Sequence, residues 1–164
     1  MAKQNTLKPE ISKAINAFSQ NNYEEAEKYC SAVLSRENDA DANHILGCIR
    51  MREKKFEESI SYINKALLTK KDDIGILISL GCAQSSKKDY SDSINTFEKV
   101  ITLKDDISQV HFYLGESYRQ TDQFSKAVEA FKRCLEITPD HIGCQLILGI
   151  TYEELKKFDQ AINF

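Results

Sequence analysis

The sequence of 164 residues lacks the features that mark several common classes of protein. No apolar run approaches the ~18 residues that a membrane-spanning helix needs, and residues 1–9 lack the apolar segment of a signal peptide. The net charge is −3, without an excess of basic residues, so nucleic acid is not an expected partner. Glycines occur singly along the chain, which excludes a glycine-rich phosphate loop.

Chemically reactive side chains are also sparse. The five cysteines form an odd set without paired spacing, which predicts reduced thiols and a cytoplasmic location. No Ser/His/Asp arrangement stands out among the three histidines. We therefore expect a protein that is not an enzyme and that uses no cofactor.

Four of the six glycines are equally spaced. They are Gly47, Gly81, Gly115 and Gly149, with 81 − 47 = 34, 115 − 81 = 34 and 149 − 115 = 34, and a leucine precedes each. An aromatic residue follows nine positions after each glycine, at Phe56, Tyr90, Phe124 and Phe158. A small residue follows twelve positions after it, at Ser59, Ser93, Ala127 and Ala161. A fixed period of this kind predicts an array of structural repeats.

The spacing inside each repeat is helical. Apolar residues recur three and four positions apart, as at Val128, Phe131 and Leu135, and no β pattern competes. Short polar turns such as Lys54-Lys55 and Lys156-Lys157 divide each repeat into two helices. Acidic residues that can cap the first helices precede most of them, at Asp39, Asp41, Asp72, Asp73, Asp105, Asp106 and Asp140.

A glycine inside a helix costs roughly 1 kcal/mol relative to alanine, so four in register indicate close approach of a neighbouring helix. Because one helical hairpin cannot bury its apolar face alone, stacking of repeats supplies the core. In the first repeat Ala14 holds the glycine position. Lys13 replaces the leucine beside it, which predicts a capping repeat with solvent on one side.

The Leu-Gly pair, the aromatic position and the small position on a period of 34 resemble the tetratricopeptide repeat (TPR). The resemblance implies an all-α fold, a right-handed α-solenoid of antiparallel helix pairs. It predicts a tail at 1–6 and one array at 7–164. The expected repeats are 7–39 (capping), 40–73, 74–107, 108–141 and an incomplete fifth at 142–164. The family's tryptophan position, four before the glycine, instead holds Asn43, Leu77, His111 and Gln145.

The fifth repeat is expected to start its second helix at about Phe158, and the chain stops at Phe164. Solenoids normally carry a polar terminal cap. We therefore expect either that the sequence is cut from a longer protein or that another chain completes its end. An exposed apolar edge also predicts self-association.

The resemblance places a concave groove on the first helices, at positions three before and one, four and five after each glycine. An apolar strip beside a mixed-charge strip there favours an extended or helical peptide, although the same residues can simply pack helix pairs. The candidate groove residues are Ile15, His44, Cys48, Met51, Arg52, Ile78, Cys82, Phe112, Glu116, Arg119, Leu146 and Ile150.

Two specialised uses of this groove do not fit the residues. The clamp that binds chaperone tails needs lysine and asparagine where this chain has Ile11 and Ile15. His44, Cys48 and Cys82 are soft ligands, but their spacing is no recognised zinc signature. We expect no metal there and interpret the thiols as groove lining.

The sequence therefore predicts a protein–protein interaction scaffold that binds a peptide or protein segment in its groove. One alternative is the TPR region of a larger enzyme, because residues 26–34 and 42–47 resemble repeats that precede glycosyltransferase and sulfotransferase domains. Another is a scaffold that self-assembles through residues 158–164.

Overall fold

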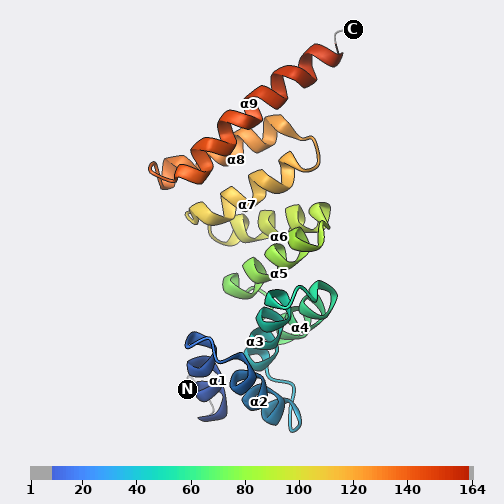
Figure 1. Cartoon of the computed structure of the whole chain (residues 1–164), viewed down its shortest axis with the longest axis vertical. Helices are drawn as coiled ribbons and strands as arrows, with labels where there is room; N and C mark the ends of the chain where they lie inside the picture. The colour runs from blue at the N-terminus through green and yellow to red at the C-terminus, as the bar shows by residue number, and fades with distance from the viewer. Residues whose placement is uncertain (1–8, 163–164) are drawn as a thin grey trace. The chain divides into compact units, whose positions relative to one another are not determined.

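The computed structural model describes the backbone of residues 9–162 and the side chains of residues 9–156, and these residues form nine helices and no strand (Figure 1). This confirms the predicted all-α class. The helices are α1 (Pro9–Ser19), α2 (Tyr23–Leu34), α3 (Ala40–Arg52), α4 (Phe56–Thr69), α5 (Ile74–Lys87), α6 (Tyr90–Leu103), α7 (Ser108–Arg119), α8 (Phe124–Ile137) and α9 (Ile142–Ile162).

The helices belong to two compact units, Met1–Ser79 and Leu80–Phe164, and α5 passes from the first unit into the second. In the first unit α1 packs on α2, α2 on α3, and α3 on α4. In the second unit α6 packs on α7, α7 on α8, and α8 on α9. Within each unit, the helices that pack on one another are thus mostly neighbours in sequence, which is the packing expected of repeats.

The turn inside each of the first four repeats has the same geometry. Asn21, Lys54, Lys88 and Asp122 all have positive φ, between 58° and 73°. At Lys54 the amide of the next residue, Lys55, donates to the carbonyl of Arg50 at 2.9 Å, and the Lys54 amide donates to Met51 at 3.0 Å. This is the Schellman motif, which satisfies the last carbonyls of the first helix.

Three of the four repeated glycines are sites of close helix contact, as predicted, and Gly149 is not. A Cβ built on Gly47 would lie 2.5 Å from Cγ1 of Ile63. One built on Gly81 or Gly115 would lie 2.6 Å from the ring of Phe97 or Phe131. Each partner lies sixteen residues after its glycine and is fully buried. The period of 34 therefore marks a contact between the two helices of one repeat.

The small position allows the same approach from the second helix. Ser59, Ser93 and Ala127 are all fully buried. The hydroxyl of Ser59 donates to the carbonyl of Gly47 at 2.8 Å, and Ser93 does the same to Gly81 at 3.0 Å. A small side chain here therefore brings the helices together and satisfies its own polar group.

The predicted helix caps are right in part. Asp39 accepts a hydrogen bond from the amide of Ala42, and Asp73 from that of Ile76, each at 3.0 Å. The expectation for Asp105 is wrong, because Ile107 occupies the N-cap of α7 and no side chain caps it. Asp105 instead pairs with Arg133 of α8 at 2.8 Å, since the charged partner attracts the carboxylate away from the helix end.

The predicted turn at Lys156-Lys157 is wrong. The helix α9 includes both lysines and runs without interruption to Ile162 (Figure 1). A non-glycine residue in the left-handed region costs roughly 1–2 kcal/mol, whereas lysine is a good helix former. In the earlier repeats the packing of a second helix on the glycine offsets that cost. At Gly149 nothing lies within 4 Å of a built Cβ, so the helix continues.

The burial of Ala14, the exposure of Lys13 and the free thiols agree with what the sequence predicts. Ala14 is fully buried in the glycine position, and Lys13 is exposed. All five cysteines are free thiols, and Cys30, Cys134 and Cys144 have no exposed surface. Burial raises the pKa of Cys30 and of Cys144 to about 12, so these thiols stay protonated and behave as small apolar side chains.

Candidate functional site

Groove candidates of the first unit lie on α1, α3 and α5. His44, Cys48 and Ile78 are half-buried, and Ser79, the residue after Ile78, joins the first two. The Ser79 hydroxyl lies 2.8 Å from Nε2 of His44 and 4.0 Å from Sγ of Cys48. Ser79 of α5 thus contacts two groove candidates of α3, His44 and Cys48. The sequence analysis did not include Ser79 among the groove residues.

The hydrogen bonds of Ser79 determine the tautomer of His44. The Ser79 hydroxyl donates to the carbonyl of Gly75 at 3.0 Å, as its position four residues further along the helix allows. Its proton is therefore unavailable to the imidazole. We infer that Nε2 of His44 carries the hydrogen and donates to Ser79.

Burial is the largest influence on His44 and lowers its pKa below the usual 6.5, although Asp73 and Asp41 act in the opposite direction. The unfolded chain then takes up a proton more readily than the folded one. We predict that the stability contributed by neutral His44 is present above pH 6.5 and is lost as the pH falls through the lowered pKa of the folded state. Urea midpoints at about pH 7.5 and about pH 5.5 measure this loss. His44→Gln, which does not titrate, should lose less stability than the parent, and an equal loss in both would contradict the prediction.

The other first-unit candidates differ in exposure. Ile15 on α1 is 41% exposed. Met51 is half-buried and Arg52 is exposed on α3. The guanidinium of Arg52 lies 4.4 Å from the ring centre of Tyr23, which is the distance of a cation–π contact. Arg52 is therefore oriented by Tyr23 rather than by another groove residue.

The polar candidates of the second unit form an ion-pair network. Nε of Arg119 lies 3.2 Å from Glu116 on the same helix, and its Nη1 lies 3.1 Å from Glu154 on α9. Burial would lower the pKa of Arg119, but bonds to the two carboxylates more than offset this and raise it. Two carboxylates around one guanidinium leave a net negative charge at this part of the second unit.

Phe112, a groove candidate expected on the exposed concave face, is instead half-buried against other aromatic rings. Its ring centre lies 5.0 Å from that of His141 in a stacked arrangement and 6.0 Å from that of Phe131. The side chain is half-buried between α8 and the start of α9. Cys82 on α5 is also half-buried. Both therefore contribute to helix packing as well as to the candidate surface.

Leu146 and Ile150, the α9 candidates, face solvent. Leu146 is 65% exposed and Ile150 is 39% exposed. The opposite side of α9 is packed, because Cys144 and Thr151 have no exposed surface and the Cys144 thiol lies 3.3 Å from the carbonyl of Phe131. The exposed leucine and isoleucine are the most accessible apolar candidates of the second unit.

Metal binding and nucleophilic chemistry have little support in the described side chains. Within residues 9–156, no three His, Cys, Asp or Glu side chains are placed to hold one metal ion. Burial raises the pKa of Cys48, which disfavours the reactive thiolate. In the described part of the chain, no helix combines the length and hydropathy needed to cross a bilayer.

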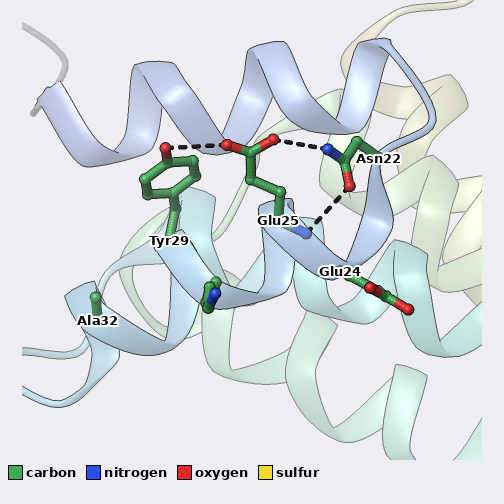
Figure 2. Close-up of a pocket in the computed structure, with 6 residues that line it drawn as sticks. Asn22, Glu24, Glu25, Tyr29 and Ala32 are labelled. Carbon is green, nitrogen blue, oxygen red and sulfur yellow. Dashed lines mark hydrogen bonds between the residues drawn. The ribbon is translucent and has the colours of Figure 1, made fainter.

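A separate hollow of about 640 Å³ lies along α2 (Figure 2). Three of its polar side chains, those of Asn22, Glu25 and Tyr29, already form hydrogen bonds with one another. The Glu25 carboxylate accepts from Asn22 Nδ2 at 2.6 Å and from the Tyr29 hydroxyl at 3.1 Å, and the Asn22 side chain caps the helix. We interpret this arrangement as a helix cap, not as a binding site.

Two polar contacts escaped sequence reasoning. Arg50 on α3 pairs with Glu27 of α2, with Glu53 at 2.9 Å and with Glu58 of α4 at 3.3 Å. His111 is buried, and its Nε2 lies 2.8 Å from the carbonyl of Asp105. Only the Arg50–Glu53 spacing of three residues was visible in the sequence, because the other partners come from different helices or from a loop.

Comparison with known proteins agrees with the helical pairs and glycine contacts. The tetratricopeptide repeat family model matches residues 40–73, and the model of anaphase-promoting complex (cyclosome) subunit 3 matches residues 86–164. A crystal structure of MamA shares 20% identity with a TM-score of 0.81, covering 92% of this chain and 88% of MamA. A second MamA structure has a TM-score of 0.83 at 18% identity, covering 95% and 93%.

The APC/C hetero-tetramer Cut9–Hcn1 also contains a similar chain, with a TM-score of 0.80 and 18% identity, covering 87% of this chain and 29% of that one. Comparison with curated proteins gives no match. At these identities the solved structures show a shared helical-repeat fold. The chain is a tetratricopeptide repeat protein.

Proposed function

We propose that the protein is a non-catalytic scaffold that binds a peptide or protein segment on the groove positions of its first helices. The main support for the proposal is that exposed apolar side chains occupy several of the groove positions. Seven large apolar or aromatic side chains are exposed among the described residues, and three of them, Ile15, Leu146 and Ile150, occupy predicted groove positions. Exposed apolar side chains on a repeat surface favour contact with apolar anchors of a partner.

The polar neighbours support binding rather than chemistry. His44 is held by Ser79, and Arg119 is held by Glu116 and Glu154, so these side chains are pre-positioned and already paired. Glu153 is exposed beside Glu154 on α9. In the second unit this charge favours a segment that carries a basic residue next to its apolar anchors. A protein partner also fits the net charge of −3 better than nucleic acid does.

A matched pair of leucines tests the proposal. Leu146, at a groove position on α9, is 65% exposed, and Leu68, at the end of α4, is 71% exposed. Peptides selected from a displayed library against the parent chain should bind Leu146→Asp at least about tenfold more weakly and Leu68→Asp unchanged. Circular dichroism checks that both variants are folded. If the selected peptides bind both variants as they bind the parent, the groove assignment on α9 is wrong.

Two further predictions remain proposals. Self-association through the C-terminal edge was assigned to residues 158–164, whose side chains lie outside the described residues. The cytoplasmic location rests on the cysteine pattern, and all five thiols are free. The TPR region of a larger enzyme remains the alternative reading, in which this chain would present substrates to a catalytic domain elsewhere.

A further inference from the structure

Arg52 on α3 differs from the other arginines of the chain. Four of the five arginines form ion pairs with carboxylates, and these are Arg36, Arg50, Arg119 and Arg133. The Arg52 side chain is exposed and makes no hydrogen bond or ion pair with any residue that the structure describes. A guanidinium carries five N–H donors that suit carboxylates. Arg52 is therefore the arginine whose donors are open to a partner.

The guanidinium of Arg52 is nevertheless held in place. It lies 4.4 Å from the ring centre of Tyr23 on α2. That ring is itself fixed, because its hydroxyl donates to the side chain of Asn21 and its centre lies 5.6 Å from that of Phe18 in an edge-to-face contact. A stacked guanidinium loses less conformational freedom on binding than a freely rotating one. The cation is thus pre-positioned for an anionic group.

Apolar side chains accompany this cation. Phe18 of α1 and Arg52 of α3 both contact the ring of Tyr23. Ile15 precedes Phe18 by three residues, so it lies on the same side of α1, and it is 41% exposed. We term Ile15, Phe18, Tyr23 and Arg52 the Arg52 subsite. It combines an exposed apolar side chain with a positive charge.

The neighbouring groove positions do not neutralise the charge of Arg52. The remaining groove positions of the first two repeats carry no acidic side chain, and they are Ile11, Ser19, His44, Cys48 and Met51. Glu53, the residue after Arg52, is bound by Arg50 at 2.9 Å and by Lys55 at 3.0 Å. The positive charge of Arg52 is thus left for a partner, in contrast to that of Arg119, which two carboxylates surround.

We propose that the Arg52 subsite binds a segment of a partner protein in which an aspartate or glutamate side chain lies close to a large apolar residue. The carboxylate accepts hydrogen bonds from the guanidinium, and the apolar side chain packs on Ile15 and Phe18. Charge complementarity selects the acidic residue, since a lysine or arginine there would be repelled by Arg52. The inference rests on the proposed function, because it names the chemistry of the segment bound at the groove positions of the first unit.

A library of random displayed peptides of about 12 residues supplies the probes. Peptides that are selected against the parent chain and lose binding to Ile15→Asp are synthesised with acetylated and amidated ends, so that only side-chain carboxylates remain. We expect these peptides to contain an Asp or Glu whose change to the amide weakens binding about threefold to tenfold in fluorescence anisotropy titrations. Arg52→Gln should weaken the parent peptides to the same extent, and the two changes combined should cost no more than either alone.

Charge reversal separates ion pairing from a loss of packing on Tyr23. Arg52→Glu should weaken the acidic peptides at least about tenfold, and a lysine in place of the acidic residue of the peptide should recover part of that loss. The matched control is Lys13→Gln. Lys13 is exposed, lies 5.7 Å from the ring centre of Tyr29 and holds no groove position, so this change removes the same charge outside the subsite. It should leave peptide affinity unchanged, and circular dichroism checks that each variant is folded.

Three results would overturn the inference. Peptides that lose binding to Ile15→Asp or Leu146→Asp but bind Arg52→Glu as they bind the parent chain would refute the Arg52 subsite and leave the proposed function standing. Equal weakening by Arg52→Gln and Lys13→Gln would assign the effect to overall charge. A selection that yields no binding peptide, or only peptides that none of the groove substitutions affects, would refute the proposed function as well.

Discussion

Gly115→Ala should destabilise the protein by about 1–3 kcal/mol, whereas Gly149→Ala should leave stability unchanged or raise it by up to about 1 kcal/mol. The Gly115 Cβ would lie 2.6 Å from the ring of Phe131, which is fully buried, so the closely packed ring must shift to make room for it. At Gly149 the space is open, so only the better helix propensity of alanine acts.

Urea unfolding followed by far-ultraviolet circular dichroism measures both free energies of unfolding. The two substitutions are chemically identical and lie at equivalent repeat positions, so each serves as the control for the other. Equal changes in stability would show that the glycine period reflects backbone conformation or chance rather than helix contact.

Phe131→Ala should cost about 3–5 kcal/mol, which is the usual range for emptying a buried aromatic site. The ring lies against Gly115, and the backbone carbonyl of the same residue lies 3.3 Å from the Cys144 thiol, so Phe131 lies between α7 and α9. Its loss removes the contacts that the ring makes with Gly115 and Phe112 on α7.

The control is Leu103→Ala on α6, where the side chain is 44% exposed. This exposed change should stay within about 0.5 kcal/mol of the parent. Thermal and urea unfolding of both variants test the prediction. A loss at Phe131 no larger than at Leu103 would mean that the ring does not support the core of the second unit.

The glycine period was predictable because it records a local rule. Gly115 and Phe131 are sixteen residues apart in one hairpin, so their contact recurs wherever that hairpin recurs. The same rule predicted the burial of Ser59 and Ser93, since a small residue is needed wherever two helices approach closely.

The turn predicted at Lys156-Lys157 was wrong because its formation depends on packing between helices, which the local sequence does not encode. Lys54-Lys55 forms a turn and Lys156-Lys157 continues a helix, although the two pairs are identical. The difference lies in the second helix that packs against Gly47 and does not pack against Gly149. Local sequence therefore allowed both conformations, and packing decided between them.

The repeat register predicted which positions belong to the candidate groove. It did not predict which of those side chains are exposed or which are paired with one another. The repeat register placed Phe112 and Leu146 at the same position of successive repeats. The structure packs Phe112 against His141 and leaves Leu146 65% exposed. The Arg119–Glu154 pair likewise joins side chains 35 residues apart, a distance at which charge pattern alone does not identify partners. Exposure and pairing depend on which neighbouring helix is present.

A double-mutant cycle on Gly115 and Phe131 tests most directly whether the repeated glycine is needed to make room for the side chain sixteen positions later. The cycle compares the parent, Gly115→Ala, Phe131→Ala and the double variant by urea unfolding. We predict a coupling energy of at least about 1 kcal/mol, because the alanine methyl no longer meets a ring once Phe131 is removed. Additive effects, with Gly115→Ala equally costly in both backgrounds, would contradict the helix contact on which the interpretation of the glycine period depends.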